Sequence, residues 1–300
     1  MDKIKPFSPN TEAEAARLIT SEIVAFTRSS PLNRLPGTDG LPIFDEPLVQ
    51  FADGDDPIFT EYKTIIDTSH LTPREALAKS YNKMPKDMLG RLSVISWILP
   101  LASKVRESNR RQKLLPSRFW SYGRWYGEKF NDALRKHVIN LLTGSGYLAA
   151  APLLEPYFDK TYQQAAGNSY FSNWSERHIA YAAGLGTFSL SDGFITPRGI
   201  AHRCGSVITD LKLPASPRTA ADHRSNCLFY VDGSCLACIA RCPAGAITEN
   251  GHDKLKCHQY SQTSISHLLA EYDVGVTGCG LCQAKVPCEF HNPAQRKKKK

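Results

Sequence analysis

The sequence predicts a mixed α/β protein whose C-terminal part forms a separate cysteine-rich module. Apolar residues recur with helical periodicity in several segments, and the apolar run at 92–102 has the length and composition of a buried strand. All nine cysteines lie between residues 204 and 288, and the first 203 residues contain none. A chain of 300 residues can bury the core that such a fold requires.

Four segments are expected to be helical. Thr11 and Glu14 have the spacing of a capping box at the start of a helix over 12–28. Proline suits the first position of a helix, so a threonine followed by proline predicts the start of a second one. The helices expected further along the chain are 72–84, which begins at Thr72 and Pro73, then 127–142 within an amphipathic stretch, and 172–182.

The rest of the chain predicts short strands and irregular segments. Residues 30–60 are rich in proline, glycine and aspartate and are expected to form a long surface excursion. Residues 215–225 read as a polar linker that leads into the cysteine module. Strands are expected at 92–102, 194–197 and 205–211.

Composition and targeting signals predict a soluble, cytoplasmic protein with reduced cysteines and no membrane partner. The chain is 42% hydrophobic and 22% charged, and no apolar run follows its first lysines as it would in a secretory signal. The longest apolar stretch, 92–102, is too short to span a bilayer. In a reducing compartment, a concentration of cysteines favours metal binding over disulfides.

The net charge says little about partners, whereas one basic segment leaves two interpretations open. Five of the eight net positive charges lie in the terminal run 296–300, which is expected to be a solvated tail. Residues 104–136 hold ten Lys or Arg against three acids, interleaved with aromatic residues. Such a segment can bind single-stranded nucleic acid by phosphate contacts and stacking. The alternative is an amphipathic helix with buried aromatic rings.

The spacing of eight cysteines predicts two [4Fe–4S] clusters. A cubane needs four thiolates, and in a two-cluster run the cysteine before proline ligates the other cluster. Cys242 precedes Pro243, so it is assigned away from its neighbours Cys235 and Cys238. Cluster 1 is therefore expected to be held by Cys227, Cys235, Cys238 and Cys288, and cluster 2 by Cys242, Cys257, Cys279 and Cys282.

Both irregularities of this pattern fall on cluster 1. Asp232 stands where the iron–sulfur run would have its first cysteine, so either Cys227 or Asp232 is expected to ligate this cluster. Cys288 lies two residues later than the usual spacing and follows Pro287 instead of preceding a proline. Cluster 1 is thus predicted to have an unusual loop.

A zinc site is the competing interpretation of the cysteines. Two C-x₂-C pairs, 235–238 and 279–282, could form one tetrahedral four-cysteine site. That interpretation leaves four other cysteines without a role. The ninth, Cys204, is expected to be a small buried residue, although it lies in a glycine-rich stretch.

Several motifs resemble those of cobalamin-dependent epoxyqueuosine reductases and reductive dehalogenases. The segments CPAGAI, KLKCHQYS and TGCGLCQ are similar to the double-cluster module of that superfamily, and AGLGTFSLSDGFITPRGIAHRCGSVITDLKLP is similar to its cobalamin-lining stretch. YGRWYGEKFNDALRKHV is similar to a further helix of the reductases but lacks their Asp-Tyr-His order. The resemblance spans about residues 90–290.

The resemblance implies a nitroreductase-like α/β core with a C-terminal ferredoxin-like double [4Fe–4S] module. The domains expected with it are 91–215 and 216–292, with part of the variable region 1–90 completing the core. A disordered basic tail is expected at 293–300 from its charge. Electrons would pass through both clusters to cobalamin. The cobalamin contacts that it implies are Gly184, Gly186, Ser191, Thr196, Arg198, His202 and Ser206.

The resemblance also implies a proton donor sixteen residues before Gly186, where this chain has Tyr170. The queuosine enzymes have Asp there, whereas the dehalogenases use Tyr. Neighbouring groups that could serve instead as donor or substrate clamp are Asn173, Glu176, Arg177 and His178, of which Asn173 and Arg177 would share a helix face.

Three functions follow as hypotheses. The first is a cobalamin-dependent iron–sulfur reductase of an unidentified small molecule, fed by a low-potential donor of the ferredoxin or flavodoxin type. The second is an electron-transfer protein without its own substrate, serving a partner such as a corrinoid protein. The third is an enzyme that acts on tRNA, although the missing Asp argues against epoxyqueuosine chemistry.

Overall fold

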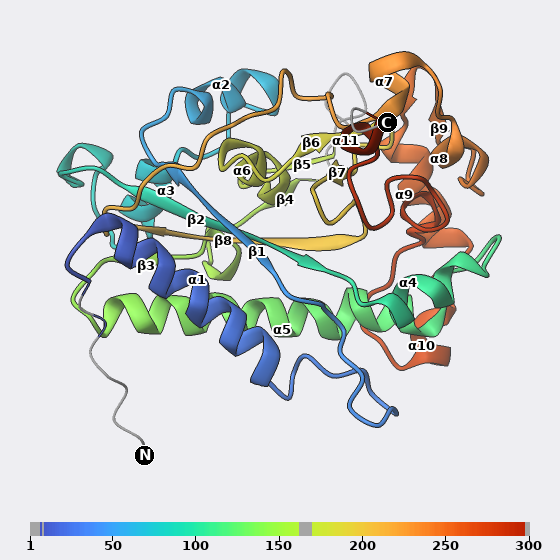
Figure 1. The fold of residues 1–300 in the computed structure, drawn as a ribbon, viewed down its shortest axis with the longest axis horizontal. Coiled ribbons are helices and arrows are strands. Elements are labelled where there is room, and N and C mark those ends of the chain that lie inside the picture. Colours follow the sequence, from blue (N-terminus) through green and yellow to red (C-terminus); the bar gives the residue numbers. More distant parts are fainter. Residues whose placement is uncertain (1–6, 8, 162–169, 298–300) are drawn as a thin grey trace.

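The centre of the molecule is a four-stranded antiparallel sheet, seen in a computed structural model that describes residues 7, 9–161 and 170–297 (Figure 1). The strand order is β1–β2–β8–β3, so the two long central strands come from distant parts of the sequence. Their bounds are Leu48–Asp53 for β1, Ser93–Pro100 for β2, Ala149–Ala150 for β3 and His202–Thr209 for β8.

Strand β2 is buried over its whole length because helices cover both faces of the sheet. Its side chains alternate between the two faces: Ile95 and Trp97 belong to one apolar cluster, and Val94 and Ile98 to the other. The predicted strand at 92–102 is thereby confirmed.

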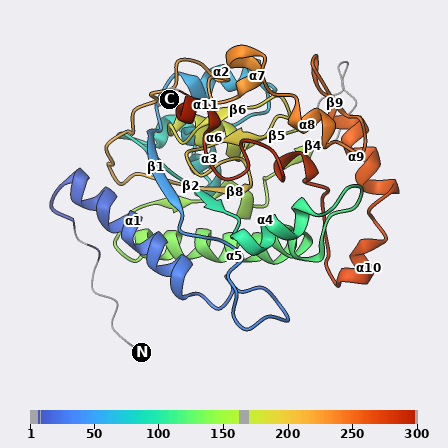
Figure 2. The same cartoon turned by 45° about the vertical axis from the view of Figure 1, so that its right-hand side comes forward.

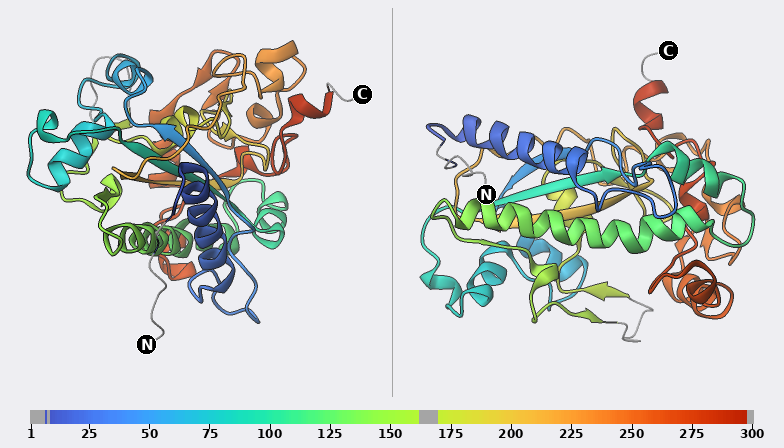
Figure 3. Two further views of the ribbon diagram at one scale, coloured as in Figure 1. Left: turned by 60° about the vertical axis from the view of Figure 1, so that its left-hand side comes forward. Right: turned by 90° about the horizontal axis from the view of Figure 1, so that it is seen from below.

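Each face of the sheet has its own helical layer (Figure 3). Helix α1 (Glu12–Ser29) and the long helix α5 (Arg118–Thr143) cover one face. Helices α2 (Ile58–Ile65), α3 (Pro73–Ser80) and α6 (Glu176–Ala182) cover the other. The capping box predicted at α1 forms only in part: the Thr11 hydroxyl accepts from the Glu14 backbone, but the Glu14 carboxylate accepts from the Asn10 backbone. Thr72 caps α3 as expected, and there Glu75 completes a capping box by accepting from the Thr72 backbone.

The cysteine module packs against one end of the sheet (Figure 2). It is built from short elements joined by loops, and α4 (Ser103–Arg110) lies beside it. Its elements are α7 (Leu228–Asp232), α8 (Ala237–Ala240), the hairpin β9 (Ile247–Thr248) and β10 (Gly251–His252), α9 (Lys254–Thr263), α10 (Leu268–Tyr272), the 3₁₀ turn η3 (Leu281–Gln283) and α11 (Pro293–Lys297).

The remaining elements are short. Among the described residues they comprise the 3₁₀ turns η1 (Pro85–Asp87) and η2 (Pro152–Leu154) and two small antiparallel pairs of strands, β4 (Lys160–Thr161) with β5 (Phe171–Ser172) and β6 (Thr187–Phe188) with β7 (Phe194–Ile195).

The basic, aromatic segment 104–136 forms α4 and most of α5, with its rings packed into the protein. Trp120 and Phe130 are buried, and Trp125 lies against Gly275, where a Cβ would come within 2.5 Å of the ring. Ser117 caps α5 by accepting from the Trp120 backbone N–H. The amphipathic-helix interpretation is therefore confirmed for these rings.

Several sequence-based boundaries were wrong. Strand β1 lies within the excursion expected at 30–60, because its six residues stand between proline- and aspartate-rich turns that hid them. Helix α6 starts only at Glu176, so Asn173 and Arg177 do not share a helix face. Residues 293–297 form α11, so the tail is not disordered from its first residue. Residues 298–300 lie outside the described residues.

The first 90 residues contribute α1, β1, α2 and α3, so they belong to the core. None of the helices in the described part of the chain combines the length and the apolar character that a membrane crossing needs.

Close packing of β8 on α5 gives a first testable prediction. A Cβ at Gly205 would lie 2.4 Å from Trp97 Nε1 and 2.7 Å from Asn131 Oδ1, two groups already joined by a hydrogen bond. Gly205→Ala should therefore lower the free energy of unfolding by about 1–3 kcal/mol in denaturant titrations. The control is Gly278→Ala, where a Cβ meets nothing within 4 Å. Equal stability of the two variants would contradict this packing.

Two histidines on the α2–α6 face predict a pH dependence of stability. Burial, reinforced by Lys63, lowers the pKa of His70 to about 4, and burial together with His70 lowers that of His178 to about 3. Near and below pH 6.5 the unfolded chain binds protons that the folded chain does not. The free energy of unfolding therefore decreases as the pH is lowered. Each histidine should contribute up to about 1.4 kcal/mol per pH unit between pH 6.5 and 5.5.

Urea titrations at these two pH values measure the slope. Replacing His178 with Gln should reduce the change in the free energy of unfolding per pH unit by the contribution of that one histidine. A slope that is the same in His178→Gln and the wild type would contradict burial of a neutral imidazole at that position.

Candidate functional site: two four-cysteine cavities

Four cysteines line one narrow cavity beside the sheet, called here the first cavity. Cys235 and Cys238 flank the start of α8, Cys227 precedes α7, and Cys288 follows η3 further along the chain. The apolar part of the wall comes from Ile195, Leu228, Val286, Pro287 and Pro293, with Ser189 and Ser191 at one side.

These thiols are close enough to affect one another electrostatically. Burial raises the pKa of Cys238 to about 11, and the Cys227 and Cys235 thiols add to the rise. Burial and the same two thiols, together with Cys238, raise the pKa of Cys288. The four cysteines expected for cluster 1 therefore form one group in space.

Helix α7 explains the long spacing between Cys227 and Cys235. Cys227 is the residue before this five-residue helix, and Gly233 ends it with a φ of +70°, which turns the chain back toward Cys235. Asp232 is exposed at the end of α7, and its carboxylate accepts a hydrogen bond of 3.0 Å from the Ser234 backbone. Cys227 lines the first cavity, whereas Asp232 is not among its lining residues.

The other four cysteines line a larger cavity of about 280 Å³, called here the second cavity. They are Cys242, Cys257, Cys279 and Cys282. Burial and the thiols of Cys279, Cys257 and Cys242 raise the pKa of Cys282 well above its usual value. Cys238 contributes to the same rise, so the two groups of thiols are neighbours.

The loop that carries Cys279 and Cys282 is held tightly against α5. Gly280 has a φ of +58°, and a Cβ there would lie 2.1 Å from Trp120 Nε1. Asn109 donates from Nδ2 to the Cys279 carbonyl over 3.4 Å, and Arg241 donates to the Leu281 and Ala284 carbonyls. Only glycine fits at position 280, so this loop has a fixed path to the cavity.

The placement of the cysteine pairs argues against a single zinc site. Cys235 and Cys238 line the first cavity, whereas Cys279 and Cys282 line the second. In addition, no three His, Cys, Asp or Glu side chains among the described residues converge closely enough for one metal ion. Four thiols spread around a cavity suit a cubane, whose irons are separated, better than a single ion.

Part of the lining of the second cavity is cationic. Arg124 and Arg203 line it and pair with Glu128, and Arg177 donates to the Asp192 carbonyl. The lining residues include no Asp or Glu. The cavity therefore suits an anionic group.

Two histidines in this lining differ in charge. Burial lowers the pKa of His202 to about 4, so its ring is neutral and hydrogen-bonded through Nε2 to the Phe194 carbonyl at 2.7 Å. Burial opposes the charged form of His252 as well, but hydrogen bonds with Asp192 and Cys257 raise its pKa to about 9. Sequence reasoning missed His252, because only the β9–β10 hairpin brings it to Cys257.

Of the residues expected to bind cobalamin, only Ser191 and His202 line the second cavity. Arg198 is 3.7 Å from Asp45, Thr196 donates to the Gly199 carbonyl, and Ser206 accepts from Trp174 Nε1. The two glycines have structural reasons too: a Cβ at Gly184 would lie 2.6 Å from the Pro217 oxygen, and one at Gly186 would lie 2.3 Å from the Ile195 oxygen.

Tyr170 lies near the second group of cysteines but is not among the residues that line the cavity. Its ring centroid is 5.0 Å from that of His258, the residue after Cys257. Residues 162–169, which precede Tyr170, are outside the described residues. Its expected catalytic role stays a prediction.

The neighbours of Tyr170 have other tasks. Asn173 donates to the Tyr157 carbonyl and His178 is hydrogen-bonded to Ser175, so both hold loops. Glu176 forms a buried ion pair of 3.1 Å with Arg135, and burial raises its pKa. Of these four candidates, Arg177 alone lines the second cavity.

Cys204 lies on β8 and is not a lining residue of either cavity. Its sulfur is 3.6 Å from His202 Nδ1, and burial raises its pKa to about 12. The thiol is thus neutral, which agrees with the expected role as a small packed residue.

Comparison with known proteins supports the resemblance inferred from the motifs. No protein-family model matches the chain. An epoxyqueuosine reductase of Bacillus anthracis is 30% identical over 128 residues, which cover 39% of this chain and 31% of that protein. The chain thus matches about a third of the length of this curated relative.

Solved structures of two activities resemble the chain. A catabolic reductive dehalogenase in complex with 3-bromo-4-hydroxybenzoic acid gives a TM-score of 0.50 at 13% identity, covering 95% of this chain and 38% of that one. A selenomethionine-labelled epoxyqueuosine reductase gives 0.47 at 16% identity, covering 91% and 66%. The dehalogenase likeness shows a shared mixed α/β fold, and the superfamily resemblance is confirmed.

The two candidates for the fourth ligand in the first cavity can be separated by substitution. Cys227→Ala should lower the iron content of the anaerobically reconstituted protein from about eight to about four per chain, because one cubane loses a thiolate. Asp232→Ala is the matched control and should keep all the iron. Full iron content and an unchanged spectrum in Cys227→Ala would instead assign the ligand to Asp232.

Proposed function

We propose that the protein is an iron–sulfur reductase that passes single electrons from cluster 1 to cluster 2 and on to an acceptor in the second cavity. The observation that carries this proposal is the partition of eight cysteines into two neighbouring cavities, four in each. The similarity to epoxyqueuosine reductases and reductive dehalogenases supports a reductase role.

The donor sets of both cavities fit [4Fe–4S] clusters. Each cavity offers four thiols, which would hold one cubane as thiolates, and bound clusters supply one-electron transfer. The raised pKa values mean that ligation releases protons from these cysteines. The Ala246 backbone N–H donates to Cys242 Sγ over 3.3 Å, the kind of contact that tunes a cluster potential.

The order of electron transfer follows from what each cavity adjoins. The second cavity extends past its cysteines to Ser191, His202 and Arg177, where an acceptor has room. The first cavity is narrow and lined mostly by apolar and cysteine residues. Cluster 1 would therefore receive electrons and cluster 2 would deliver them. This favours a reductase over a carrier without its own substrate.

The side chains around the acceptor would bind and orient it. Arg177 extends from α6, and the paired Arg203 and Arg124 add positive charge to the wall. These cations attract a carboxylate or phosphate of the acceptor as well as balancing the negative charge of the thiolates. We infer a small anionic substrate.

The observed cavity does not fit a whole cobalamin. Its volume of about 280 Å³ is at the lower limit for drug-sized ligands, and cluster 2 would share that space. The space beside the two glycines expected to contact cobalamin, Gly184 and Gly186, is occupied by the Pro217 and Ile195 backbone instead. Two further glycines of the same stretch are equally crowded: at Gly193 a Cβ would lie 2.4 Å from Ile200 Cδ1, and at Gly199 2.4 Å from the Phe290 nitrogen. We therefore route no step through cobalamin.

The cobalamin-dependent reductase implied by the motifs is the second candidate. The observation in its favour is that Ser191 and His202, both in the stretch that resembles a cobalamin-lining segment, face the same cavity as Cys242 and Cys282. Tyr170 would be the proton donor in that scheme.

A tRNA substrate has less support from the structure. One similar structure is an epoxyqueuosine reductase with an epoxyqueuosine-modified tRNA stem loop, at a TM-score of 0.46 and 17% identity. In this chain the aromatic rings Trp120 and Phe130, which could have stacked on bases, are buried.

Cobalamin titration separates the two reductase schemes. The anaerobically purified protein, with both clusters in place, should show no stoichiometric uptake of cobalamin, and its clusters should still be oxidised by small electron acceptors. Arg177→Gln should weaken that reaction for anionic acceptors and leave neutral ones unchanged. Uptake of one cobalamin per chain, with a spectral change on reduction, would establish the second candidate.

A further inference from the structure

The last cysteine of the first cavity leads directly to the protein surface. Cys288 lines that cavity, Glu289 is completely buried, and Phe290 is 43% exposed. If electrons enter at cluster 1, as the proposed function requires, this segment is a short route from solvent to the cluster.

The Glu289 carboxylate fixes the segment against α4. Its Oε1 is 3.2 Å from Arg106 Nη1, and its Oε2 is 2.7 Å from Arg110 Nε. The Lys285 backbone N–H donates to Oε2 as well, over 2.7 Å. Two guanidinium groups on one carboxylate leave a net positive charge at this place.

Phe290 lies beneath the same two arginines. The guanidinium carbons of Arg106 and Arg110 are 5.2 and 5.6 Å from the centroid of its ring. An exposed aromatic ring held by two cation–π contacts is a rigid apolar spot within a charged surface. Such anchors are typical of protein interfaces.

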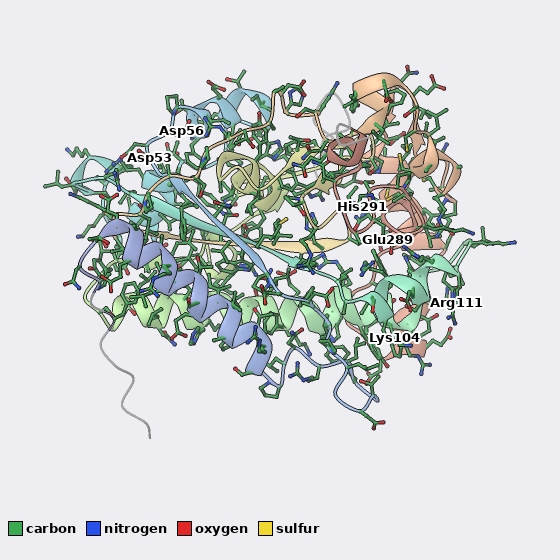
Figure 4. The ribbon with its side chains drawn as sticks, in the orientation of Figure 1. Asp53, Asp56, Lys104, Arg111, Glu289 and His291 are labelled. Carbon is green, nitrogen blue, oxygen red and sulfur yellow. The ribbon has the colours of Figure 1, made fainter. Side chains whose placement is uncertain are left out.

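The surroundings of this ring are basic. Lys104, Arg111, Lys113 and Lys285 are exposed, and Figure 4 shows Lys104, Arg111 and Glu289 at the same end of the molecule. Among residues 103–113, Glu107 is the one acidic residue. We call the surface of α4, residues 111–113 and residues 285–290 the basic face.

We propose that the basic face docks the protein's electron donor, a small acidic one-electron carrier protein. Charge complementarity would steer the carrier to α4, and Phe290 would anchor it over Cys288. One electron leaves the carrier and one enters cluster 1, so neither proton nor further reactant is needed. RNA is the less favoured occupant, because single-stranded RNA is bound by stacking several bases on aromatic rings, and Trp120 and Phe130 of the basic, aromatic segment are buried.

The test uses the full chain with both clusters and a reduced plant-type [2Fe–2S] ferredoxin, which is acidic, as the probe. Stopped-flow absorbance follows cluster reduction under anaerobic conditions at two salt concentrations. The double variant Lys104→Glu, Arg111→Glu should slow reduction by about tenfold or more at low salt, and the difference should shrink at high salt. Lys83→Glu, Lys86→Glu, with exposed lysines beside η1 outside the basic face, is the matched control.

A second variant and a second reductant keep the outcomes distinct. Phe290→Leu should slow reduction by the ferredoxin without changing its salt dependence. Dithionite, a small reductant, should reduce all variants at the wild-type rate. If dithionite reduces the wild type but both charge variants react equally with ferredoxin, the docking proposal is wrong. If dithionite reduces nothing, the proposed function itself fails. Loss of RNA binding in the double variant with unchanged ferredoxin kinetics would overturn the proposal in favour of RNA.

Discussion

Backbone hydrogen bonds between the start of β8 and the last cysteine segment hold the cysteine module against the sheet. The Ile200 N–H donates to the Cys288 carbonyl over 2.8 Å, and the Ala201 N–H donates to the Glu289 carbonyl over 3.2 Å. The Ala201 carbonyl in turn accepts from Leu101, next to β2. The first cavity depends on this contact, because Cys288 completes a group whose other members come from residues 227–238. The basic face depends on it too.

Buried charge reinforces the same junction. Glu289 joins α4 to the module through Arg106 and Arg110, and a second network under the sheet links Glu128 of α5 to Arg203 of β8 and to the fully buried Arg135. Removing one partner from such a network costs more than its net contribution to stability, since a buried charge is left uncompensated. These buried ion pairs thus fix the position of the cavities relative to the sheet, and substitution of a single partner is expected to be destabilising.

The sequence was sufficient for the features that local chemistry decides. Thr72 caps α3 as predicted, and the apolar run around Trp97 forms the central strand β2. The cysteine spacing divided eight cysteines into two groups of four, and in the structure each group lines a cavity of its own. The sequence could not reveal β1, because its pairing with β2 is a long-range contact. It also could not explain Gly184 and Gly186, where the Pro217 and Ile195 backbone leaves no room for a side chain. His252 was missed for the same reason: its neighbour Asp192 is distant in sequence.

The central claim is that this chain holds two [4Fe–4S] clusters in adjacent four-cysteine cavities. The most direct measurement is an iron, acid-labile sulfide and zinc count on the full chain, purified and kept without oxygen. The account predicts about eight iron and eight sulfide per chain with no stoichiometric zinc. About four iron, or zinc in place of iron and sulfide, would contradict it.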